Sequence, residues 1–109
     1  MIVVNRFRVP ADDPAAEAAF RADLQQAHEA LAARPGYLHG GIGRNVDDPT
    51  LWVLTTTWEH VGAYRRALSS YDVKLYAVAT LSRAVEEPSA YEVVTPESEL
   101  NTHAARSLP

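Results

Sequence analysis

Two aromatic residues whose types could do chemistry, Trp58 and Tyr64, lie six positions apart. The alternating residues 51–58 predict a strand that ends at Trp58, and Tyr64 falls in the helix expected next. A phenol can pass a proton or orient a bound oxygen atom, and an indole can stack on a flat ligand. The pair could therefore take part in the chemistry of a pocket. The alternative is that both rings are core residues that anchor the second helix on the sheet.

Asn5 is the third candidate catalytic residue. It lies in the middle of a strand predicted over residues 2–9, on the face that also carries Phe7. A buried amide without hydrogen-bond partners costs about 1–3 kcal/mol. Asn5 therefore either reaches into a pocket or is satisfied by the backbone or by a neighbouring side chain, and the sequence leaves both readings open.

Four further residues could bind a substrate: Phe7, His28, His39 and Tyr76. His28 borders the apolar stripe of the first predicted helix, where it could face a pocket as a base or simply flank the core. His39 has a similar claim on a glycine-rich strand. The chain has no cysteine, and its four histidines show no His-x-x-x-His spacing. We therefore expect no metal site.

Hydrophobic periodicity predicts strands and helices in the order β-α-β-β-α-β, with the second helical region in two parts. The segments expected are residues 2–9, 12–33, 37–46, 51–58, 60–68, 71–81 and 90–94. This order is typical of the ferredoxin-like sandwich of the α+β class, an antiparallel sheet with its helices on one face. We expect one domain over residues 2–95, followed by a polar C-terminal tail over 96–109.

The face of the predicted sheet that carries no helices would expose apolar side chains such as Val4, Val53 and Val93. A second copy of the chain, packed sheet against sheet, would cover them. Because two-fold dimers are the commonest oligomers, we expect a homodimer through the sheet faces. The alternative is a monomer with a partly apolar surface.

Composition and charge narrow the possible partners. The chain has 109 residues and a formal net charge of −4, and its ten Lys and Arg form no run. No nucleic-acid partner is indicated. No apolar stretch approaches the ~20 residues needed to cross a bilayer. The N-terminus does not resemble a signal peptide, so we expect a cytoplasmic protein with no membrane partner.

Short motifs spread over about residues 2–94 carry a family resemblance. They are residues 5–10 (Asn-Arg-Phe-Arg-Val-Pro), 34–38 (Arg-Pro-Gly-Tyr-Leu), 58–59 (Trp-Glu), 63–64 (Ala-Tyr) and 88–93 (Pro-Ser-Ala-Tyr-Glu-Val). Their order and distances resemble the antibiotic biosynthesis monooxygenase family of dimeric α+β barrels. The resemblance implies a pocket between sheet and helices. Some members oxidise polycyclic phenols with molecular oxygen and no cofactor, others degrade haem, and others have no established activity.

Some of the family's functional residues have counterparts in this chain, and others do not. Anthrone-oxidising members have an active-site Trp and Tyr spaced like Trp58 and Tyr64, and haem-degrading members have a pocket Asn at the position of Asn5. The anthrone oxidisers also carry an Asn where this chain has Leu54, and their functional Arg has no counterpart in residues 76–79.

Haem degradation matches this chain less well. Haem-degrading members have an axial His where this chain reads Tyr-Ala-Val at 76–78, and a second Trp where Ala67 stands. Only Tyr71 or Tyr76 could then ligate the iron.

Two functions of different class follow. The first is a cofactor-independent monooxygenase for an aromatic or polyketide-type small molecule. The second is a non-catalytic ligand-binding or assembly domain on the same scaffold. The first requires Trp58, Tyr64 and Asn5 to reach a pocket, whereas the second requires them to be locked in a filled core.

Overall fold

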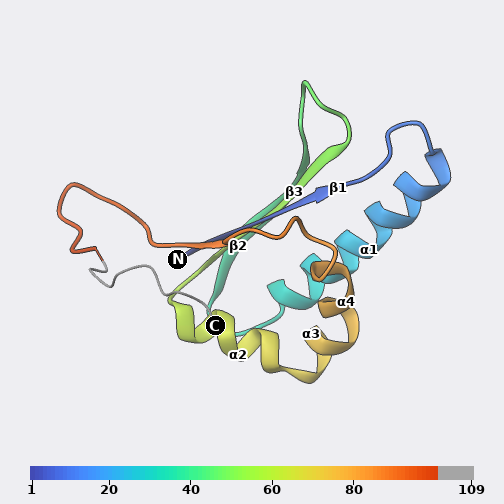
Figure 1. The fold of residues 1–109 in the computed structure, drawn as a ribbon. Coiled ribbons are helices and arrows are strands. Elements are labelled where there is room, and N and C mark those ends of the chain that lie inside the picture. Colours follow the sequence, from blue (N-terminus) through green and yellow to red (C-terminus); the bar gives the residue numbers. More distant parts are fainter. Residues whose placement is uncertain (101–109) are drawn as a thin grey trace.

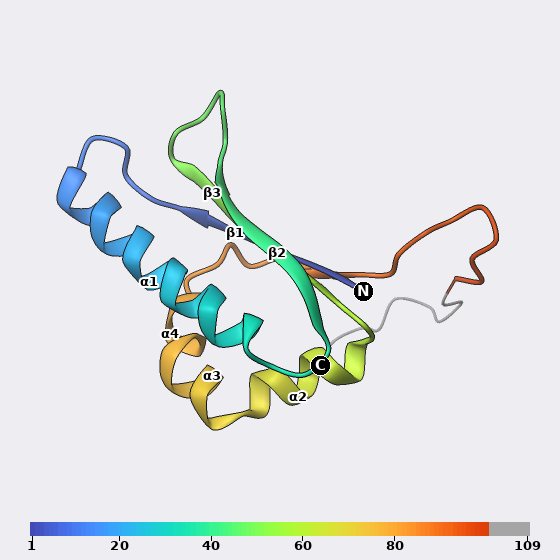
Figure 2. The same ribbon diagram turned by 180° about the vertical axis from the view of Figure 1, so that it is seen from behind.

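A computed structural model describes residues 1–100. Its elements are β1 (Ile2–Arg8), α1 (Pro14–Ala32), β2 (Tyr37–Arg44), β3 (Leu51–Trp58), α2 (Val61–Ser69), α3 (Tyr71–Tyr76), α4 (Val78–Leu81) and β4 (Ala90–Tyr91). The strands form one antiparallel sheet in the order β2-β3-β1-β4. All the helices lie on one side of this sheet (Figure 1), as the view from behind also shows (Figure 2). The predicted ferredoxin-like α+β fold is confirmed.

The first helix begins and packs as its sequence predicts. The Asp13 carboxylate accepts a hydrogen bond from the Ala16 amide at 3.0 Å, and Pro14 follows in the first turn, where its missing N–H costs nothing. Four apolar side chains spaced three or four apart are fully buried against the sheet. They are Phe20, Leu24, Ala27 and Leu31.

The central strands β1 and β3 supply the other wall of the core. Every second residue of β3 is buried, namely Trp52, Leu54, Thr56 and Trp58. The register pairs Phe7 with Trp52 and Asn5 with Leu54. Asn5 therefore faces the helices, on the same side of the sheet as Trp58.

The second helical region differs from the sequence expectation. Residues 71–81 were expected as one helix, but α3 ends at Tyr76 and α4 begins at Val78. Between them Ala77 is buried, with φ −127° and ψ −39°. The break changes the direction of the chain so that both short helices pack against α1.

The last strand is shorter than the predicted 90–94. In β4, Ala90 pairs with Val3 and Tyr91 pairs with Ile2. Because the partner strand runs antiparallel and starts at Ile2, the chain after Tyr91 has no residues of β1 left to pair with. Val93 and Val94 therefore extend beyond the sheet and are 50% and 66% exposed. Residues 101–109 of the predicted tail lie outside the described residues.

Strand β2 contains one irregularity that matters for the site. Tyr37 pairs with Trp58 and His39 pairs with Thr57. From the first pair to the second, β2 therefore moves by two residues and β3 by only one. Leu38 is the extra residue of this bulge. A bulge reverses the alternation of side chains on either side of it. Tyr37 consequently lies on the helix side of the sheet, whereas His39 lies on the open side.

Strand β2 also ends at Arg44, before the predicted Val46. The side-chain oxygen of Asn45 accepts hydrogen bonds from the amides of Asp47 and Asp48 at 2.9 and 2.8 Å. Such a side-chain turn replaces strand pairing as the chain reverses into β3.

Candidate functional site

Trp58 is held rigidly at the end of β3. Its side chain is fully buried, and its Nε1 donates a hydrogen bond to Thr56 Oγ1 at 2.8 Å. Its backbone amide donates to the Met1 carbonyl at 2.9 Å. The polar edge of the indole is thus satisfied inside the protein, and its ring faces remain available to neighbouring aromatic groups.

Tyr64 joins the other two candidate catalytic residues. From α2 its ring lies 5.4 Å from that of Trp58, centroid to centroid, at 52°. Burial raises the pKa of Tyr64 above its usual value, and a side-chain hydrogen bond with Asn5 offsets part of that rise. The Tyr64 phenol therefore stays protonated at neutral pH. The three residues form one cluster on the helix side of the sheet.

Gly36 sets the position of the helix that carries Tyr64. Its φ is +89°, a conformation that residues with a side chain rarely adopt. A Cβ at Gly36 would overlap the Ala63 Cβ, and the Gly36 carbonyl accepts a hydrogen bond from the Glu59 amide at 2.8 Å. This close approach places α2, and Tyr64 with it, against the end of β3.

Tyr37 is a residue of this cluster that sequence reasoning did not select. Its ring meets the Trp58 ring edge-on, with centroids 5.5 Å apart. Its hydroxyl is 2.7 Å from His28 Nε2, and burial raises its pKa. The candidate ligand-binding residue His28 is therefore connected to Trp58 through Tyr37. The Pro-Gly-aromatic motif was the available signal for Tyr37, but the motif alone does not show which face the ring takes.

The remaining candidates lie elsewhere. Phe7 is buried in a second aromatic group, 5.2 Å from Phe20, which itself lies 5.7 Å from Trp52. His39 is exposed on the open face of the sheet. Tyr76 is 44% exposed at the end of α3.

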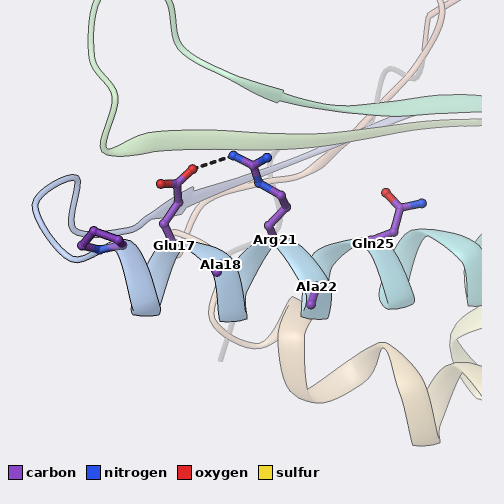
Figure 3. Close-up of a pocket in the computed structure, with 6 residues that line it drawn as sticks. Glu17, Ala18, Arg21, Ala22 and Gln25 are labelled. Atoms are coloured by element: carbon purple, nitrogen blue, oxygen red, sulfur yellow. Dashed lines mark hydrogen bonds and ion pairs between the residues drawn. The ribbon is translucent and has the colours of Figure 1, made fainter.

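Four surface hollows of the described residues lie away from the cluster. One of about 490 Å³ lies on α1 (Figure 3), where Glu17 and Arg21 form an ion pair at 2.6 Å. Others of about 310, 450 and 190 Å³ lie between α1 and α3, beside β4, and on the open sheet face. Asn5, Trp58 and Tyr64 line none of these four. Their contacts are with one another, and Trp58 is fully buried in the core.

Residues 1–100 contain neither a cluster of metal-binding side chains nor a membrane-spanning helix. No group of three or more His, Asp or Glu side chains in this range is placed to hold a metal ion. No helix of the same range is long and apolar enough to span a membrane.

The sequence matches the model of a protein family described as antibiotic biosynthesis monooxygenase over residues 1–79. A mutant of SnoaB, a cofactor-independent oxygenase from Streptomyces nogalater, has a similar structure, with TM-score 0.69 and 24% identity over 89% of this chain and 96% of that one. Rv0793 from Mycobacterium tuberculosis is also similar, with TM-score 0.63 and 23% identity over 92% and 97%. No curated protein matches the chain.

Proposed function

Because the chain belongs to the antibiotic biosynthesis monooxygenase family, we propose that it is a cofactor-independent oxygenase for an aromatic, polyketide-type small molecule. The structurally similar SnoaB is a cofactor-independent oxygenase. The observation that carries the proposal is that the protonated phenol of Tyr64 contacts both the amide of Asn5 and the indole of Trp58.

These residues need to supply only part of the chemistry, because the substrate itself can react with oxygen. An electron-rich phenol or anthrone can lose a proton and then reduce oxygen by one electron without a cofactor. The protein must hold the substrate, exclude water, and accept or return the proton. Tyr64 is suited to hydrogen-bond a substrate oxygen and to relay its proton, because its own phenol is neutral. Asn5 orients that hydroxyl, and Trp58 offers a flat apolar surface for a polycyclic ring.

The active form in this proposal is a homodimer that associates through the open sheet faces. Val4 and Val53 lie on this face and are only partly buried in the single chain. Apolar sheet faces normally pack against another layer at about 10 Å. Sedimentation of the purified chain tests this part, and a monomer at micromolar concentration would contradict it.

A second candidate function is a non-catalytic binding or assembly domain. The packing of the cluster favours it, because Trp58 is fully buried and bonded to Thr56. For the oxygenase to operate, a substrate must open this packing and take the place of side-chain contacts at Tyr64.

Oxygen uptake by metal-free protein distinguishes the two. We would measure it with a panel of anthrones and polycyclic hydroquinones for the wild type, Tyr64→Phe and Trp58→Phe. Tyr71→Phe and Trp52→Phe are matched controls, because Tyr71 is 77% exposed and Trp52 lies in the other aromatic group.

An oxygenase raises uptake above the spontaneous rate, and loss of its proton relay in Tyr64→Phe lowers the rate about 10²–10⁴-fold. The controls keep the wild-type rate. Uptake at the spontaneous rate across the panel would favour the binding domain. Full activity in Tyr64→Phe would refute the assignment of the site.

A further inference from the structure

A continuous series of ring contacts runs from the proposed site, along the helix side of the sheet, to the partly exposed His28. The ring of Trp58 lies 5.4 Å from Tyr64 and 5.5 Å from Tyr37. The Tyr37 ring lies 5.9 Å from that of His28. Such centroid separations are those of aromatic rings in direct contact. The four rings come from α2, β3, β2 and α1, so tertiary packing alone brings them into line.

The two tyrosines that touch Trp58 differ in their hydroxyl partners. Tyr37 has the imidazole of His28 at 2.7 Å, and when Nε2 is the unprotonated nitrogen the phenol donates to it. Tyr64 has the amide of Asn5, which cannot accept a proton at neutral pH. A phenol gives up an electron far more easily when a base takes its proton at the same time. Of the two, Tyr37 is therefore the easier to oxidise.

We propose that Trp58, Tyr37 and His28 form a relay that carries one-electron oxidising equivalents away from the Trp58–Tyr64 site. A one-electron oxidant at the site, such as a partly reduced oxygen species or a substrate radical, takes an electron from Trp58. The tryptophan radical cation then takes one electron from Tyr37. The O–H bond of Tyr37 breaks, and its proton passes to His28 Nε2. The products are neutral Trp58, a Tyr37 phenoxyl radical and a His28 imidazolium ion.

The far end of the relay is open enough for the radical to be repaired. Gly40 is exposed and lies beside the Tyr37–His28 pair. A Cβ at Gly40 would lie 2.9 Å from the Tyr37 hydroxyl and 3.2 Å from His28 Nε2. Such a Cβ would also overlap the Thr55 carbonyl oxygen, so only glycine fits beside the pair. Tyr37 and His28 are themselves only partly buried, and the pair can therefore be reached from the surface. A small reductant such as a thiol can return the electron to Tyr37, and His28 can release its proton to water.

The relay can be tested without substrate, by laser photoionisation of tryptophan in the Trp52→Phe variant. Trp58 is then the only tryptophan of the chain. We expect the absorption of the tryptophan radical to decay while that of a tyrosyl radical rises at the same rate. Adding Tyr37→Phe should abolish the rise, whereas adding the matched Tyr64→Phe should leave it. A rise that survives Tyr37→Phe, or no rise at all, would overturn the proposal.

Two further measurements test the proton step and do not depend on the tyrosine variants folding. Because the O–H bond breaks, the tyrosyl rise should slow in D₂O. It should also be lost or slowed in His28→Gln, which keeps a hydrogen-bonding group but removes the base. If the tyrosyl radical formed at the same rate in H₂O, in D₂O and in His28→Gln, His28 would not be part of the relay. Oxygen uptake and radical transfer are measured separately, so either this proposal or the proposed function can fail alone.

Discussion

The close approach of Gly36 to α2 allows a stability prediction to be worked out in full. Gly36→Ala introduces two costs. A residue with a Cβ at φ +89° costs about 1–2 kcal/mol relative to glycine. The new Cβ also overlaps that of Ala63, and overpacking of this kind costs about 1–3 kcal/mol. The free energy of unfolding should therefore fall by about 2–5 kcal/mol.

Urea unfolding followed by tryptophan fluorescence measures this loss. For a domain of this size each kcal/mol corresponds to a fall in Tm of about 4–8 °C, so the smallest expected loss lowers Tm by about 8 °C. Because α2 must move away from β3, the contact between Tyr64 and Trp58 should loosen as well. In the proposed oxygenase, Gly36→Ala then lowers activity even where the protein is fully folded.

A double-mutant cycle separates the two costs. Ala63→Gly removes the overlapping Cβ and by itself costs about 1 kcal/mol of helix propensity. Introduced into that variant, Gly36→Ala should cost only its backbone part, and the coupling between the two changes should be about 1–3 kcal/mol. An equal cost of Gly36→Ala with and without Ala63→Gly would show that the contact does not position α2.

Two more predictions concern the buried polar groups of the site. Thr56→Val leaves the indole N–H of Trp58 without its partner and should lower the unfolding free energy by about 1–3 kcal/mol, measured in urea. Thr56→Ser keeps the hydroxyl, and an equal loss in both variants would count against the hydrogen bond. Since the pKa of Tyr64 is raised in the folded state, the unfolded chain ionises first as pH rises. Stability should therefore fall above pH about 10, and less steeply in Tyr64→Phe; identical pH profiles would contradict this.

The sequence predicted the face of the sheet on which two of the three candidate catalytic residues lie. Alternation in residues 51–58 places Trp58 on the buried face, and the same rule places Asn5 on the helix side of β1. Tyr64 follows in the next helix, close enough to reach both. The face of each residue follows from local periodicity, whereas contact among the three also requires the pairing of Asn5 with Leu54 and the approach of α2 to β3.

The parts that could not be predicted depend on register between strands. Phe7 shares a face with Asn5, but its partner Trp52 places it in a different aromatic group. The length of β4 depends on where β1 begins to pair. The position of Tyr37 depends on the bulge, because strict alternation would place Tyr37 and His39 on the same face.

That bulge has an evolutionary consequence. The additional residue of the bulge, Leu38, is 53% exposed and fills no core position. Loss of a single codon there would give a regular strand in which Tyr37 still pairs with Trp58 and His39 with Thr57, because adjacent residues of a strand alternate in face. The contacts of Tyr37 with Trp58 and His28 would therefore survive that deletion. A further residue inserted between Tyr37 and His39 would likewise have to be accommodated outside the regular pairing, so this part of β2 can vary in length among relatives without a change in the aromatic cluster.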